Sequence, residues 1–172
     1  AEQAGDTLKI GRRGSINFRL TVTGTQGHVG YPHKAKNPIP VLAALVIRLA
    51  GHVFHDGNDH FEPSTLSFTS IDVGNTVTNV IPAEARAAFN IRFNNSHTPG
   101  TLTDWVETEA SAIARASGCN IGVEYSVSGV SFLTAPGPFT TLISDAVQSV
   151  TGKAPRFSTS GGTSDARFIK DI

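Results

Sequence analysis

SINFRLTVT, which spans Ser15–Thr23, alternates apolar and polar side chains along its whole length. Successive side chains of a strand leave on opposite sides, so this alternation places the apolar members on one face. The pattern predicts a strand with one face buried and the other in solvent. A second stretch, Ala83–Phe93, alternates in the same way, with alanine, isoleucine and phenylalanine on its apolar side. The rest of the fold is predicted outward from these two strands.

Two helices and two further strands surround them in the sequence. Asn37-Pro38 predicts a helix start, with an apolar stripe that follows at helical spacing as far as Ala50. The further predicted elements are strands at Thr65–Val73 and Ile121–Val130 and a helix at Thr101–Ser117, which Gly118 ends. The order β-α-β-β-α-β predicts an α+β class, ferredoxin-like sandwich over residues 15–132, a four-stranded antiparallel sheet with both helices on one face.

The remaining residues are not needed to complete this unit. Pro136-Gly137-Pro138 interrupts the chain, Phe139–Val150 has the pattern of a helix, and Arg156–Thr159 is a candidate short strand. We therefore expect three parts. Residues 1–14 are a stub and linker, residues 15–132 the sandwich, and residues 133–172 a C-terminal fragment of an α/β domain.

Composition excludes several classes of function. The 172 residues are 39% hydrophobic and 16% charged, with a formal net charge of zero, so no overall field attracts nucleic acid or an anionic membrane. Cys119 is the single cysteine, which precludes an intramolecular disulfide and favours a reducing, cytoplasmic location. The longest apolar stretch, Ile39–Ala50, contains Arg48 and is too short to span a bilayer. No signal-peptide pattern opens the chain, and without a methionine its first residue need not be the natural start.

Three segments are richer in polar functional groups than packing requires. In Gly24–His33, glycines flank His28, which could donate a hydrogen bond to an oxyanion; the alternative is a plain loop. In the second segment, Asn79 lies on a loop, and Arg92 lies on the polar side of the next strand. Arg92 could bind a carboxylate through two hydrogen bonds, or it could be a solvated strand arginine.

The third segment, Ser158–Arg167, combines two adjacent glycines with hydroxyl side chains and an arginine. Successive backbone amides in such a stretch can form an anion-binding nest, whereas the alternative is a flexible linker. The chain has six histidines, which are possible ligands for a metal ion. Only His52, His55 and His60 cluster, near Asp56, Asp59 and Glu62, but no HExxH or cysteine pair is present. We interpret this cluster as a solvated loop and predict no metal site.

Together these segments resemble one family. The run KIGRRGS at residues 9–15 is followed by Gln26-Gly27-His28, Tyr31-Pro32-His33 and Asn37-Pro38. NVIP at residues 79–82, NIRF at 90–93 and STSGGTSDARF at 158–168 continue the match in the same order. The whole chain resembles the succinyl-diaminopimelate desuccinylases of the zinc aminoacylase and carboxypeptidase superfamily, from the dimerisation (lid) domain into part of the catalytic domain.

The resemblance implies a bacterial enzyme with two zinc ions that hydrolyses N-succinyl-L,L-diaminopimelate in lysine biosynthesis. In that family the metal ligands lie before and after the segment matched here. We therefore expect no zinc in this chain and no activity from it alone. The resemblance further implies a homodimer. The strand at Thr65–Val73 lies at a sheet edge and would pair with its symmetry mate, while the first helix packs beside its copy.

The resemblance also assigns roles to individual residues. It implies that His28 stabilises the oxyanion and that Asn79 binds the substrate, both from the partner subunit. Arg92 and Thr163 would hold the carboxylates of a succinylated dicarboxylic amino acid. Arg12, Tyr31, Gly162 and Arg167 would complete the pocket.

Two other readings remain open. One is the same segment of a related deacylase, such as an acetylornithine deacetylase or an aminoacylase. The other is a stand-alone ferredoxin-like dimerisation module. An RNA-binding role is disfavoured because the outward residues of the strand at Ala83–Phe93, among them Arg86 and Asn90, include no aromatic pair.

Overall fold

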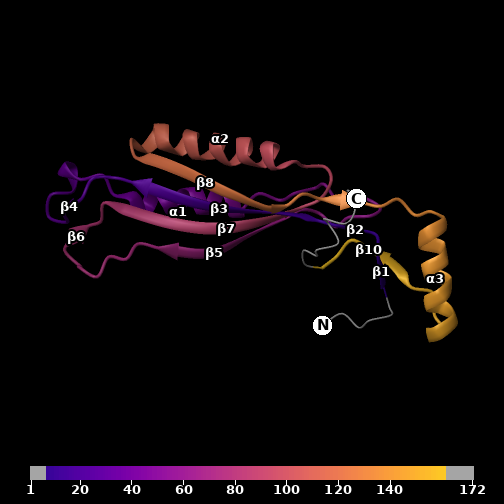
Figure 1. The fold of residues 1–172 in the computed structure, drawn as a ribbon. Coiled ribbons are helices and arrows are strands. Elements are labelled where there is room, and N and C mark those ends of the chain that lie inside the picture. Colours follow the sequence, from indigo (N-terminus) through magenta and orange to yellow (C-terminus); the bar gives the residue numbers. More distant parts are fainter. Residues whose placement is uncertain (1–6, 162–172) are drawn as a thin grey trace.

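The computed structural model describes residues 7–161 of the chain. Two parts are visible in Figure 1: a four-stranded sheet with two helices, and a smaller group of elements beyond one end of it. The α+β class predicted from the sequence is confirmed. The first part contains β3 (Gly14–Thr23), β4 (Gly27–His28), η1 (Pro32–Lys34), α1 (Pro38–Ala50), β5 (Thr65–Asp72), β6 (Val80–Ile81), β7 (Glu84–Phe93), α2 (Pro99–Ser117) and β8 (Asn120–Gly129).

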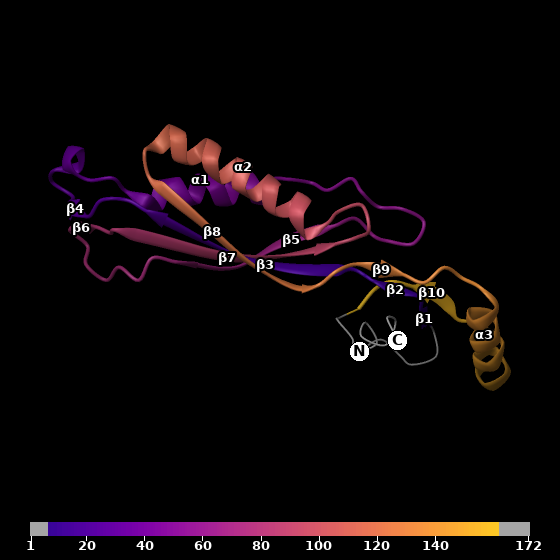
Figure 2. The ribbon, with the colours of Figure 1, turned by 45° about the horizontal axis from the view of Figure 1, so that its top comes forward.

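The main sheet is antiparallel, with strand order β5-β7-β3-β8. The two stretches with alternating apolar and polar residues, Ser15–Thr23 and Ala83–Phe93, form its central strands, β3 and β7. Phe18 faces Phe89 across this pair, and their rings stack with centroids 4.9 Å apart. The apolar sides of β3 and β7 form the core with α1 and α2, and both helices lie over the same face of the sheet (Figure 2).

The helices begin and end where side chains or glycines satisfy the backbone. The Asn37 side chain accepts a hydrogen bond from Ile39 N at 3.0 Å, as expected for the predicted cap of α1. Gly118 ends α2 in the left-handed conformation, at φ 68°. However, α2 begins two residues before the predicted Thr101, because Thr98 caps it and Pro99 occupies the first turn.

The smaller part joins both ends of the described chain. It contains β1 (Thr7–Lys9), β2 (Gly11–Arg12), β9 (Phe132–Leu133), α3 (Pro138–Thr151) and β10 (Arg156–Ser158). β1 pairs with β10 in parallel, and β2 pairs with β9 in antiparallel orientation. The predicted helix and short strand of this region are therefore present. The stretch before residue 15, predicted to be a stub and linker, contains two short strands that the sequence did not reveal, because their pairing partners lie more than a hundred residues away.

Three loops differ from the sequence expectation. The segments 24–33 and 74–82 were expected to be loops, but they pair with each other through β4 and β6. His52–Pro63 was interpreted as a solvated loop, yet Phe54 and Phe61 within it are buried. Within the described residues, no helix is both long and apolar enough to cross a bilayer.

Candidate functional site

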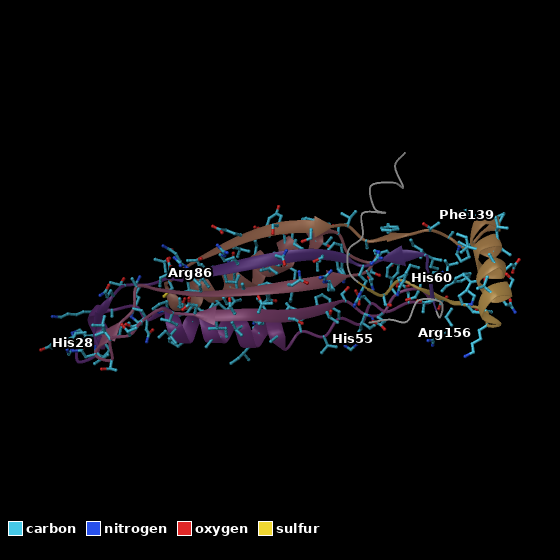
Figure 3. The ribbon with its side chains drawn as sticks, turned by 60° about the horizontal axis from the view of Figure 1, so that its bottom comes forward. His28, His55, His60, Arg86, Phe139 and Arg156 are labelled. Carbon is cyan, nitrogen blue, oxygen red and sulfur yellow. The ribbon has the colours of Figure 1, made fainter. Side chains whose placement is uncertain are left out.

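One end of the first part is formed by residues 24–37 and 74–82, which we call the tip. Pairing of β4 with β6 sets Gly27 opposite Ile81 and His28 opposite Val80. Val29 N also donates a hydrogen bond to Asn79 O at 3.1 Å. The pairing and this hydrogen bond bring His28 and Asn79 close together. These two predicted site residues lie 51 positions apart in the sequence. Figure 3 shows His28 at this extreme of the molecule.

The imidazole of His28 is exposed and oriented by its own loop. Gly30 N donates a hydrogen bond to His28 Nδ1 at 3.0 Å. An Nδ1 atom that accepts a hydrogen bond carries no proton, so in the neutral ring the proton is on Nε2. Nε2–H is then the group that His28 offers to a ligand. A loop histidine with this tautomer can donate a hydrogen bond to a carbonyl oxygen or an oxyanion.

Tyr31 lies beside His28 at the tip. Its side chain is 58% exposed, and its ring centroid is 6.1 Å from that of His28. Tyr31 N donates to His28 O at 2.9 Å, and the turn continues directly into η1. The structure therefore brings together three of the residues predicted for the site, His28, Tyr31 and Asn79.

Arg92 lies toward the opposite end of the first part, which we call the base, and Arg12 lies on β2 of the smaller part. Both side chains belong to half-buried residues, on β7 and β2 respectively. Neither guanidinium has a hydrogen bond or ion pair to any of residues 7–161. Arg86, on the same strand as Arg92, is instead paired with Glu84 at 2.5 Å. A partly buried guanidinium without a protein partner is suited to bind a carboxylate.

A ladder of polar side chains fixes the strand next to Arg92. Asn90 donates from its side-chain amide to Ser15 Oγ at 3.0 Å and to Asn17 Oδ1 at 2.8 Å. Asn17 in turn donates to Ser128 Oγ at 3.1 Å, so the ladder crosses β7, β3 and β8. Ser15 is the register partner of Arg92. The backbone that carries Arg92 is thus held by side chains as well as by the strand pairing.

The tip and the base cannot form one site within a single chain. β7 starts next to β6 at the tip and carries Arg92 near its other end. A strand rises about 3.3 Å per residue, so Arg92 lies about 26 Å from the start of β7 at Glu84, and further from the tip. Figure 3 shows His28 at one end of the molecule, with His55 and His60 toward the other end.

The third predicted segment lies partly outside the described residues. Three predicted site residues, Gly162, Thr163 and Arg167, lie outside the described residues. Of the described part, Lys9 Nζ donates to Ser160 Oγ at 2.8 Å, and Thr159 Oγ1 donates to His60 O at 2.6 Å. Thr159, Ser160 and His60 border a cleft of about 620 Å³ between β10 and the loop at residues 57–63, which Arg13 also lines.

The histidine-rich loop at residues 51–64, which we call the anchoring loop, has a structural role that the sequence did not reveal. Asp56 accepts hydrogen bonds from Ser64 N at 2.7 Å and Ser64 Oγ at 2.5 Å, and His97 Nε2 is 3.1 Å from its carboxylate. The fully buried Asn94 donates to Asp56 O at 2.7 Å and accepts from Ser96 N. Asp56 is therefore the centre of a polar network, not a solvated residue.

The protonation of Asp56 reflects this network. Burial raises the pKa of its carboxyl, but the hydrogen bonds from Ser64 and the nearby His97 outweigh burial and hold the pKa below its ordinary value. Asp56 is thus ionised at neutral pH. Among the described residues, no group of three or more histidine, cysteine, aspartate or glutamate side chains is placed to hold a metal ion.

The sequence of this chain is similar to those of known proteins. Residues 10–117 match the model of a family described as a peptidase dimerisation domain. A succinyl-diaminopimelate desuccinylase of Ruegeria pomeroyi is 53% identical over 170 residues, which are 99% of this chain and 45% of the relative. One of Maricaulis maris is 54% identical over 166 residues, 96% of this chain and 43% of the relative. The chain thus spans under half the length of the curated relatives it matches.

Solved structures of low sequence identity share the fold. A tripeptidase from Staphylococcus aureus superposes with a TM-score of 0.78 at 17% identity, covering 99% of this chain and 44% of that one. An aminopeptidase from Bacillus cereus gives a TM-score of 0.74 at 20% identity, covering 98% and 44%.

Proposed function

The chain belongs to the peptidase dimerisation domain family, and we propose that it is the dimerisation and substrate-binding segment of a dinuclear zinc amidohydrolase. The proposed reaction of the parent enzyme is hydrolysis of N-succinyl-L,L-diaminopimelate to succinate and L,L-diaminopimelate. The observation that carries this proposal is the identity of 53% to a desuccinylase over nearly the whole chain. The guanidiniums of Arg12 and Arg92, which have no hydrogen bond or ion pair among residues 7–161, support it, because the substrate has several carboxylates.

In this proposal the tip of one subunit completes the active site of the other. His28 donates Nε2–H to the oxyanion that forms when the amide carbonyl is attacked, and Asn79 and Tyr31 contact the substrate beside it. Arg92 binds a substrate carboxylate in its own subunit, with Arg12, Gly162, Thr163 and Arg167 around it. The separation of tip from base within one chain supports this division, because a single subunit cannot bring His28 to Arg92.

We propose that the dimer forms through α1 and β5. β5 is an edge strand of the sheet, and α1 packs on the β5 side whereas α2 packs against β8. Ile47 on α1 is 73% exposed, and Ile71 on β5 is also exposed. In a two-fold symmetric dimer that forms at this edge, Ile47 and Ile71 of both subunits would become buried.

Sedimentation tests the interface. Ile47→Asp should raise the dimer dissociation constant at least about a hundredfold, since an apolar contact is lost and a charge is buried on both sides of the two-fold axis. Val150→Asp on α3 is the matched control, because Val150 is similarly exposed but lies in the smaller part. A chain of monomer mass at all micromolar concentrations, without substitution, would contradict the proposed dimer.

Subunit complementation tests the function and the division of labour together. In the whole hydrolase that carries this segment, His28→Ala and Arg92→Ala should each abolish most of the hydrolysis of the succinylated substrate. A heterodimer of the two variants should recover about half of the sites, because one site then receives an intact Arg92 and, from its partner, an intact His28. If both residues acted within one subunit, mixing would restore nothing.

The specificity of the parent enzyme has its own assay. Efficient hydrolysis of N-acetylornithine with none of the succinylated substrate would replace this proposal with the related deacetylase. The succinylated substrate is the one that the names of the most similar curated relatives favour.

The zinc ions of the proposed reaction do not fit the described residues of this segment, which offer no group of three ligands. We propose that they are held elsewhere in the parent enzyme and that this chain alone is inactive. Metal analysis of the chain after dialysis should find less than stoichiometric zinc. One or two tightly bound ions per chain would show that the segment contains ligands of its own.

We further infer the domain division from the fold. Residues 15–132 are the dimerisation domain, with a ferredoxin-like arrangement that the sheet order β5-β7-β3-β8 supports. Residues 1–14 and 133–172 belong to the catalytic domain. The parallel pairing of β1 with β10 supports this assignment, because parallel strands are characteristic of α/β domains.

A further inference from the structure

We infer that Lys34 is a specificity-determining residue that binds the terminal carboxylate of the acyl group cleaved by the enzyme. The inference rests on the proposed function and adds a residue that neither the sequence pattern nor the family resemblance singled out. It places in the tip a cation whose partner is the succinyl group rather than the amino-acid part of the substrate.

The charge of the tip is the first observation. Residues 24–37 and 74–82 contain Lys34, Lys36 and two histidines but no aspartate or glutamate. The tip therefore has a net positive charge of two with neutral histidines, although the whole chain has none. A surface of this sign at the exposed end of the domain favours an anionic ligand.

The two lysines differ in what their ammonium groups contact. Lys36 Nζ donates to Gly118 O at 3.0 Å, so Lys36 is engaged at the carboxyl end of α2. Lys34 Nζ instead lies over the ring of Tyr31, 5.3 Å from its centroid. This cation–π contact restricts a flexible side chain without using its hydrogen-bond donors, which stay available to a ligand.

The position relative to His28 selects the carboxylate. Both groups lie beside the Tyr31 ring, whose centroid is 6.1 Å from that of His28 and 5.3 Å from Lys34 Nζ. In the proposed reaction His28 contacts the oxygen of the scissile carbonyl, which belongs to the acyl group. In a succinyl group only two methylenes lie between that carbonyl and the terminal carboxylate. Lys34 is therefore placed near the acyl end of the substrate.

The local backbone holds this arrangement. Lys34 N donates to Tyr31 O at 3.0 Å within η1, and Tyr31 N donates to His28 O at 2.9 Å. His28, Tyr31 and Lys34 thus follow one another at intervals of three in a hydrogen-bonded turn. Because the turn holds these three residues close together, a substrate that contacts His28 also lies near the Tyr31 ring and the ammonium group of Lys34.

The test compares two substrates of the whole hydrolase that differ only in charge. One is N-succinyl-L,L-diaminopimelate, and the other is its succinamoyl analogue, in which a carboxamide replaces the terminal carboxylate. Lys34→Gln should lower kcat/KM for the succinyl substrate about tenfold, as expected for loss of one charge-assisted hydrogen bond. It should change kcat/KM for the succinamoyl analogue by less than about twofold, since that analogue lacks the charge.

Two further variants complete the test. Lys34→Arg should retain most of the preference for the succinyl substrate, and Lys153→Gln, an equal change of charge after α3, should leave both substrates unaffected. Equal losses on both substrates, or no loss on either, would overturn the role of Lys34 while leaving the proposed function intact. Absence of succinyl hydrolysis by the unsubstituted enzyme would overturn both proposals.

Discussion

The tip and the anchoring loop lie at opposite ends of the same sheet and contain charged residues of opposite sign. The tip contains two lysines and no acidic residue, whereas the anchoring loop, residues 51–64, contains Asp56, Asp59 and Glu62 and no lysine or arginine. The tip exposes His28, Tyr31 and Asn79. The anchoring loop turns Asp56 inward, onto Ser64 and the buried Asn94.

The difference shows how polar residues in a loop divide between ligand binding and stability. His28 makes its loop hydrogen bond through Nδ1 and is exposed, so Nε2–H costs little stability, because water solvates it in the absence of a ligand. An aspartate in the anchoring loop has its hydrogen bonds satisfied by the protein, and its removal leaves buried donors without an acceptor. We therefore expect substitutions of the exposed site residues of the tip to change activity, and substitutions of the buried network of the anchoring loop to change stability.

The largest expected effect is at the tip. His28→Ala in the whole hydrolase should lower kcat about 100- to 1000-fold, the range measured when one oxyanion donor is removed. The unfolding free energy of the chain should stay within about 0.5 kcal/mol, since His28 is exposed. His55→Ala, at an exposed histidine of the anchoring loop, is the control and should leave kcat unchanged. Equal losses of kcat from both variants would contradict the proposed difference between the tip and the anchoring loop.

The second effect is on stability. Asp56→Ala should lower the unfolding free energy by about 2–4 kcal/mol, because Ser64 and His97 lose their acceptor in a largely buried site. Urea unfolding of the chain measures this change. Asp59→Ala, at an exposed aspartate three residues later, should cost less than about 0.5 kcal/mol. A similar cost for both substitutions would mean that the anchoring loop is solvated, as the sequence had suggested.

A smaller loss of stability is expected from removing the cap of α1. Asn37→Ala should cost about 1 kcal/mol, because Ile39 N loses the side-chain oxygen that caps α1. Asn37→Ser should restore most of the loss. Thermal unfolding followed by circular dichroism measures both. Stability unchanged by Asn37→Ala would show that water satisfies the end of α1 equally well.

The smallest effect appears only in acid. The pKa of Asp56 is lower in the folded chain than its ordinary value of about 3.9, so the network contributes its full stability above that value. The contribution is lost as the pH falls through the depressed pKa, because the carboxyl then takes up a proton. The stability difference between the unsubstituted chain and Asp56→Asn should be constant above about pH 5 and shrink below pH 4. A difference that grows on acidification would contradict this assignment.

The sequence predicted the elements with a regular pattern and missed those that depend on remote partners. Alternation over Ser15–Thr23 and Ala83–Phe93 predicted β3 and β7 nearly to the residue, because a half-buried strand imposes a period of two on its side chains. β4 and β6 have two residues each, too few for any period, and they exist because two loops meet. The polar network of Asp56 was missed for the same reason, since Asn94 and His97 lie some forty residues away.

The sequence by itself determined the α+β class, the capped helices and the residue types of the candidate site, since these follow from local periodicity, caps and motifs. Only the tertiary structure decided which of those residues lie together. It joined His28 to Asn79 through β4 and β6, separated both from Arg92 by the length of β7, and placed Lys34 over Tyr31. The physical reason is that side-chain proximity depends on long-range strand pairing and loop conformation, neither of which leaves a period in the sequence.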